Sequence, residues 1–193
     1  MEISEEQNPN KIVIRKFNFT CDGQDDSIPA PLPRTYNHFL MITAKPKQGK
    51  TTLIYNLLTK AHKLYNKKFD RIYIFSPSLK TIDDDPFSDL EDDQKFSELT
   101  ADNLQHVYDE VEGSGERVLL VMDDVVNDIK KNEGVEKLLS KMMMNRRHIC
   151  GRAEDGDSCG ISCWLTSQVF NKCPRPLRAS ASHHIIFKTS NKK

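Results

Sequence analysis

The stretch "MITAKPKQGKTTL", Met41 to Leu53, decides the fold. An apolar run over residues 38–43 leads into a short loop, and leucines at helical spacing follow from residue 50 onward. A loop of the form GxxxxGK followed by Ser or Thr, between a strand and a helix, surrounds phosphates with its backbone N–H groups. Its lysine reaches the terminal phosphates, and its hydroxyl binds magnesium. We therefore predict that the nucleotide is held by Ala44, Lys45, Pro46, Lys47, Gln48, Gly49, Lys50, Thr51 and Thr52.

The loop departs from the general pattern at its first position, where Ala44 stands in place of glycine. Alanine has the smallest β-carbon and takes ordinary backbone conformations, so the change is tolerable there. Gly49, where a side chain would collide with the β-phosphate, is retained. A lysine-rich surface turn could match by chance, but it would not explain a strand, a loop and a helix whose positive dipole end faces the same anion.

Four further apolar runs follow, over residues 71–76, 117–123, 161–167 and 183–188. Between the runs, apolar residues at helical spacing predict helices over Lys50 to Asn66, Ala101 to Val111 and Val135 to Arg147. This alternation of apolar runs and predicted helices is typical of an α/β fold with a mostly parallel central sheet between two layers of helices.

The segments outside this alternation are polar. Residues 1–34 combine one alternating run, "KIVIRKFNF", with a proline-rich stretch, which predicts an edge strand and a wrapping arm before the main domain of residues 35–193. The acidic residues 80–99 predict a solvated surface excursion, and "CGRAEDGDSCG", residues 150–160, predicts an exposed hairpin or loop insertion.

Two aspartates follow the third apolar run. Open parallel sheets place their ligands at the carboxyl ends of the strands, where Asp123 and Asp124 fall. We expect Asp123 to bind Mg²⁺ through water and Asp124 to act as the general base. The alternative, two acids that cap a strand-to-helix turn, fits Asp124 better than Asp123.

The fourth run ends in a polar pair, Ser167 and Gln168. A glutamine there can hydrogen-bond the γ-phosphate or the attacking water. Its strand would lie between the phosphate-loop strand and the Asp123 strand, as in oligomeric motor ATPases. An arginine from a neighbouring subunit commonly neutralises the transferring phosphate. The candidates are Arg146, Arg147 and Arg178, with Arg147 favoured because it ends a predicted helix; each could equally be a solvated cation or a contact to DNA phosphates.

Composition narrows the class of protein. The 28 basic and 28 acidic side chains balance, so no global field favours nucleic acid or a membrane, but residues 130–193 hold 13 Lys and Arg against 5 acids. The five cysteines form no CxxC pair and, with the histidines, no recognisable zinc spacing, which favours reduced thiols. No apolar run has the length of a membrane span, and the polar N-terminus is unlike a signal peptide. We expect a soluble protein that is not secreted.

Six segments, in order, carry a resemblance: "FLMITAKPKQGKTTLI", "FDRIYIFSPS", "LLVMDDVV", "NRRHI", "WLTSQVF" and "LRASASHHIIFK". The chain from about Asn37 to Lys188 resembles the genome-packaging ATPases of poxviruses, other large nucleocytoplasmic DNA viruses and virophages, a branch of the FtsK/HerA superfamily of P-loop NTPases.

The resemblance implies a motor that uses ATP and Mg²⁺ to thread double-stranded DNA into a preformed capsid. It implies a homo-oligomeric ring, a pentamer or hexamer, that docks on a capsid or portal-vertex protein in the virion or the host-cell cytoplasm. Lys50 and Thr51 would contact the nucleotide and its metal, and Asp123 the metal. Asp124 would stand where related motors often carry glutamate, and Gln168 would be the sensor.

Three departures from the family pattern leave alternatives open: Ala44, the shorter side chain of Asp124, and the long connection at residues 151–160. Relatives also continue into further helices beyond the position of Lys188, which suggests a fragment or a reduced motor. The alternative function is a nucleotide-gated assembly protein with slow or no hydrolysis. A small-molecule kinase is disfavoured because residues 76–87 offer no evident acceptor pocket.

Overall fold

The computed structural model describes residues 23–59, 64–80, 87–153 and 159–188. Its centre is a six-stranded sheet in the order β3-β2-β4-β5-β1-β6, in which every neighbouring pair is parallel. The strands are β1 (Phe39–Thr43), β2 (Arg71–Phe75), β3 (Lys95–Phe96), β4 (Arg117–Met122), β5 (Gly160–Ser167) and β6 (His183–Ile186). The predicted α/β fold is confirmed. So is the additional strand, because β5 lies between β1 and β4.

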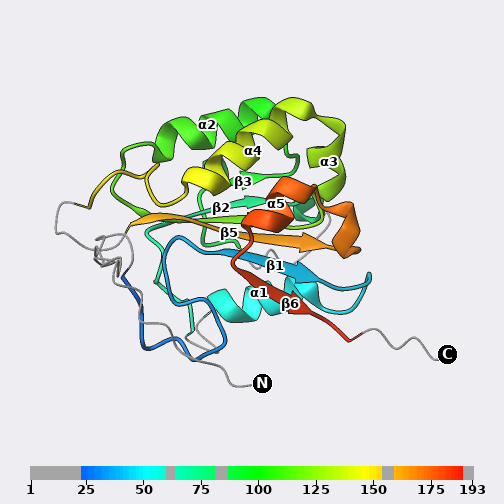
Figure 1. The fold of residues 1–193 in the computed structure, drawn as a ribbon, viewed down its shortest axis with the longest axis horizontal. Helices are drawn as coiled ribbons and strands as arrows, with labels where there is room; N and C mark the ends of the chain where they lie inside the picture. The colour runs from blue at the N-terminus through cyan, green and yellow to red at the C-terminus, as the bar shows by residue number, and fades with distance from the viewer. Residues whose placement is uncertain (1–22, 60–63, 81–86, 154–158, 189–193) are drawn as a thin grey trace, which may run out of the picture.

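Helices cover both faces of this sheet (Figure 1). One face carries α2 (Ala101–Val111), α3 (Val126–Lys131), α4 (Glu133–Asn145) and α5 (Arg175–Ser180), and the other carries α1 (Lys50–Leu58). The short 3₁₀ helices are η2 (Pro77–Lys80), η3 (Asp92–Gln94) and η4 (Phe170–Lys172). The molecule is therefore a three-layer sandwich, as predicted.

The central strands β1, β4 and β5 bury side chains on both faces, which explains why they read as continuous apolar runs, whereas the edge strand β6 exposes His184 and Ile186. In β4, Val118, Leu120 and Met122 belong to the core cluster under α2 and α4, whereas Leu119 and Val121 belong to the cluster under α1. The same alternation places Asp123, the next residue after β4, on the α1 side of the sheet.

Two predicted helices have different bounds. The helix predicted over Lys50 to Asn66 ends at Leu58, because Thr59 adopts an extended conformation (φ −85°, ψ 167°). Tyr65 then folds back, with its N–H donated to the carbonyl of Leu57 at 3.0 Å. The helix predicted from Val135 begins at Glu133, because the side chain of Asn132 caps it by accepting hydrogen bonds from two backbone N–H groups of the first turn.

The acidic region after β2 is only partly a surface excursion, which corrects the prediction. Phe87 is buried, and Lys95–Phe96 add a strand beside β2. The Phe96 ring stacks on Phe75 with the ring centroids 4.8 Å apart. A short apolar contact thus holds the far edge of the sheet, whereas residues 81–86 lie outside the described part.

The N-terminal strand predicted at residues 11–19 also lies outside the described residues. Residues 23–34 are described: Ile28 is buried among the side chains under α1, and Asp25 forms an ion pair with Lys68 at 2.7 Å. In the predicted connection at residues 150–160, the flanking Cys150 and Cys159 are buried. Across the described ranges, no helix combines the length and apolar character needed to cross a bilayer.

Candidate nucleotide-binding site

The predicted phosphate loop leaves the carboxyl end of β1 and opens α1 (Figure 1). Ala44 is 2% exposed, and its N–H is donated to the carbonyl of Ser167 in β5, so alanine fits its position in an ordinary conformation. Lys47 and Gly49 have positive φ, 61° and 87°. Among the described residues, no atom outside the immediate chain neighbours lies within 4 Å of the place where a β-carbon on Gly49 would stand. The loop therefore curves around space that is open to a ligand.

The amino end of α1 is suited to an anion. Gly49 at the N-cap provides no side-chain hydrogen bond, and the first turn carries no acidic residue. The N–H groups at the start of a helix have no partner within the helix, and the helix dipole favours negative charge beside them. The predicted ligands Lys50, Thr51 and Thr52 occupy this first turn.

Lys50 crosses the mouth of the loop. Its side chain is largely buried, and its ammonium donates to the carbonyl oxygens of Ala44 and Lys45 at 3.0 and 3.3 Å. Gln48 supports the loop, because its side-chain oxygen accepts the N–H of Lys45 at 3.0 Å. An ammonium held by carbonyl oxygens can exchange them for the stronger hydrogen bonds of phosphate oxygens.

Asp123 lies beside the first turn of α1. It is 4% exposed, and its Oδ2 accepts the hydroxyl proton of Thr51 at 2.7 Å. The hydroxyl oxygen of Thr51 keeps its lone pairs for a cation. A carboxylate and a hydroxyl in direct contact are the groups that P-loop proteins use around Mg²⁺. The donor set therefore fits the ion: Thr51 would be a direct ligand, and Asp123 would lie behind it.

Asp124 is exposed and has a left-handed backbone with φ 59°, which is uncommon for a residue other than glycine. Both of its carboxylate oxygens accept hydrogen bonds from the side-chain amide of Gln168, at 3.0 and 3.3 Å. The two residues line a depression of about 220 Å³ with Ser167 and Lys172. The structure thus brings the candidate base and the candidate sensor together at the carboxyl edge.

Sequence reasoning missed Thr166. It is fully buried in β5, donates its hydroxyl proton to Asp123 Oδ1 at 2.7 Å and accepts the N–H of Asp124 at 2.9 Å. One signal could have found it. Thr166 is a polar residue near the end of an apolar run, directly before the polar pair Ser167 and Gln168.

Arg147 does not join this group within its own chain. It follows α4. The carbonyl of its neighbour Arg146 accepts the N–H of Ile161 near the start of β5, at the amino-terminal ends of the strands and away from the predicted site. Arg146 also donates to the carbonyls of Asn37 and Met143. Arg178 lies in α5 with its guanidinium over the Phe170 ring, 5.2 Å from the centroid. The arginine donor remains a prediction.

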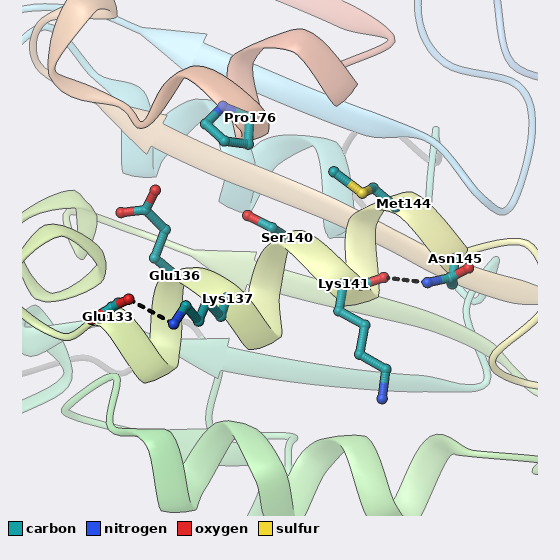
Figure 2. A pocket seen from close by; sticks show the side chains of 8 residues that line it. All are labelled: Glu133, Glu136, Lys137, Ser140, Lys141, Met144, Asn145 and Pro176. Carbon is teal, nitrogen blue, oxygen red and sulfur yellow. Dashed lines mark hydrogen bonds and ion pairs between the residues drawn. The ribbon is translucent and has the colours of Figure 1, made fainter.

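A separate groove of about 530 Å³ runs between α4 and α5. Figure 2 shows its lining, which includes Met144 and Pro176 and the ion pair between Glu133 and Lys137. None of the predicted site residues lines this groove. Among the described residues, no group of three or more His, Cys, Asp or Glu side chains is arranged to hold a metal.

The strand order, the loop between β1 and α1, and the contact between Thr51 and Asp123 together decide the fold family. The chain has a P-loop NTPase fold. No protein-family model matches the sequence, and no curated protein matches it either. Among solved structures, three variants of RuvB from Thermotoga maritima are similar, with 14 to 15% identity and TM-scores of 0.46 to 0.47. The similarity covers 78% of this chain but only 38% of each RuvB chain.

Proposed function

We propose that this P-loop NTPase is an ATPase that translocates double-stranded DNA during the packaging of a viral genome. The observation that carries the proposal is the direct contact between Thr51 and Asp123, at 2.7 Å. The hydroxyl belongs to α1, the helix after the phosphate loop. The carboxylate follows β4, which is two positions from β1 in the sheet. Their contact at the loop mouth is the arrangement that lets both share the Mg²⁺ of a bound nucleotide.

The residues of this chain divide the work of hydrolysis. Backbone N–H groups at the start of α1 bind the phosphates, and Lys50 leaves the loop carbonyls to contact the terminal phosphates. Thr51 and Asp123 would hold Mg²⁺, which would supply positive charge against the charge that develops on the phosphates. Asp124 accepts a proton from the attacking water through an oxygen that the Gln168 amide releases, and Gln168 orients that water by hydrogen-bonding to it.

The coupling to DNA and the ring are supported by the sequence. The basic side chains of residues 130–193 suit a surface that faces DNA phosphates in a channel. The six motif segments resemble packaging motors that work as pentamers or hexamers on a capsid or portal vertex, in the virion or the host cytoplasm. In a ring, Arg147 of one copy could reach the nucleotide of the next.

The test is ATP turnover with and without double-stranded DNA. We expect DNA to stimulate turnover and Lys50→Ala to abolish it. Lys137→Ala is the matched control for turnover without DNA, because Lys137 is an exposed lysine on α4, which covers the opposite face of the sheet from α1. No stimulation by DNA, together with wild-type turnover in Lys50→Ala, would refute the proposal.

A second function is a nucleotide-gated assembly protein that hydrolyses slowly. The contact of Gln168 with both carboxylate oxygens of Asp124 favours it, because each oxygen of the candidate base already accepts a hydrogen bond from the Gln168 amide. Tight ATP binding without phosphate release would decide for this function. Negative-stain images with a nonhydrolysable ATP analogue separate the two further: rings support the motor, and persistent monomers support the gated module.

A further inference from the structure

Thr166 joins the two acidic residues through one hydroxyl group. Its oxygen lies 2.7 Å from Asp123 Oδ1 and 2.9 Å from the backbone nitrogen of Asp124. The side chain is fully buried, so water does not compete for either contact. The register of the sheet explains the position: Met122 of β4 pairs with Leu165 of β5, which places Thr166 beside Asp123.

The directions of the hydrogen bonds are determined by chemistry. A hydroxyl has one proton to donate, and the N–H of Asp124 can only donate. Thr166 therefore accepts from Asp124 and donates to Asp123, while Thr51 donates to the other oxygen of Asp123. Both oxygens of Asp123 are acceptors, so the plane of the carboxylate is fixed by a donor on each side.

The second contact acts on the backbone of Asp124. A left-handed conformation is unfavourable for a residue with a β-carbon, so it needs contacts that hold it. The hydroxyl of Thr166 satisfies the Asp124 N–H in this conformation, and the amide of Gln168 holds the carboxylate. Among the hydrogen bonds of the described residues, the Thr166 hydroxyl is thus the one group of β5 that contacts both Asp123 and Asp124.

We infer that Thr166 is a positioning residue for hydrolysis: its hydroxyl orients the Asp123 carboxylate toward the ion and holds Asp124 in the turn that presents the base. This inference rests on the proposed ATPase function. Thr166 is buried behind the two aspartates and acts through them. The loss of such a supporting partner behind a metal ligand lowers metal affinity or activity about 10- to 100-fold.

The test compares Thr166→Val, which keeps the shape but removes the hydroxyl, with Thr166→Ser, which keeps the hydroxyl. Ser162→Ala is the matched control, because Ser162 is a fully buried hydroxyl on the same strand and face that contacts His38 instead. Steady-state turnover gives kcat, KM and the Mg²⁺ concentration for half-maximal rate. Calorimetry of ATP binding with and without Mg²⁺ gives the gain in affinity that the ion provides.

We expect Thr166→Val to lower kcat about 10- to 100-fold, to raise the Mg²⁺ requirement and to reduce the affinity gain from Mg²⁺, with metal-free ATP affinity unchanged. Thr166→Ser restores these properties, and Ser162→Ala leaves them at wild-type values. If Thr166→Val does not fold, Thr166→Cys keeps a similar volume with a weak hydrogen-bonding group and should give the same losses.

Wild-type kcat and Mg²⁺ requirement in Thr166→Val would overturn the inference, as would an equal loss in Ser162→Ala. If the wild-type chain binds ATP without turnover, the hydrolytic function fails, but the binding measurement still decides the role of Thr166. An undiminished affinity gain from Mg²⁺ in Thr166→Val then refutes it independently.

Discussion

Acid should destabilise this protein through one buried histidine. His38 is 2% exposed, and its Nε2 accepts the indole N–H of Trp164 at 2.7 Å, so the ring is neutral with its proton on Nδ1. That proton is donated to the carbonyl of Thr35 at 2.6 Å. A second proton would sit on Nε2 and face the Trp164 N–H, which would place two hydrogen-bond donors against each other. Burial, with smaller contributions from the charges of His183 and Arg146, lowers the pKa of His38 from 6.5 to about 4.

The direction and the size of this change in unfolding free energy follow from proton linkage. Because the folded-state pKa lies below the unfolded value, the unfolded chain binds this proton first as the pH falls. The contribution of His38 is fully present above pH 6.5 and is lost between pH 6.5 and about 4. The difference in pKa corresponds to about 3 kcal/mol of unfolding free energy. Burial and His184 also lower the pKa of His183, which adds a loss of the same sign in this region.

The assay is urea unfolding at a series of pH values, followed by the fluorescence of Trp164, the only tryptophan. His38→Gln is the comparison, because its amide can still accept from Trp164 but does not titrate. The wild-type free energy should fall by about 3 kcal/mol more than that of the variant between pH 7 and pH 4. If His38→Gln does not fold, an NMR titration of the His38 ring replaces it. Parallel pH profiles, or a ring that titrates near 6.5, would refute the reasoning.

Three further predictions concern the loop, a helix cap and the base. Gly49→Ala should cost about 1 to 2 kcal/mol of stability through its positive φ and weaken ATP binding, as measured by unfolding and calorimetry; unchanged values of both would contradict the loop geometry. Asn132→Ala should cost about 1 kcal/mol by removing the cap of α4 while ATP binding stays unchanged, which thermal unfolding and calorimetry check. Asp124→Asn should lower kcat about 100-fold or more without loss of ATP affinity in steady-state assays, and a wild-type rate would exclude it as the base.

The sheet could be predicted because its central strands β1, β4 and β5 are buried on both faces. The runs that became β1, β2, β4, β5 and β6 each carry consecutive apolar residues, and the polar residues that end them mark the carboxyl edge. The place of β5 beside β1 was predicted from Gln168 together with the motif order. The contact between Thr51 and Asp123 also lies at the carboxyl ends of the strands, so the sequence could predict that these two residues lie close together.

What could not be predicted depends on register and on single contacts. The two hydrogen bonds of Thr166 require β5 to pair with β4 at one offset, and no local pattern determines that offset. The strand at Phe96 lies in an acidic stretch. The acidic composition predicts a surface segment, and the stacking of Phe96 on Phe75 leaves no pattern in the sequence. The end of α1 at Leu58 depends on Tyr65 folding back to the core, although Leu64 continued the helical spacing.

The most direct measurement of the central claim is calorimetry of ATP binding to the wild-type chain and to Lys50→Ala and Asp123→Asn, each with and without Mg²⁺. We predict one nucleotide per chain, weaker binding in Lys50→Ala under both conditions, and in Asp123→Asn a loss confined to the gain from Mg²⁺. Equal binding by all three proteins, or no binding by the wild type, would contradict a phosphate loop that shares its ion with Asp123.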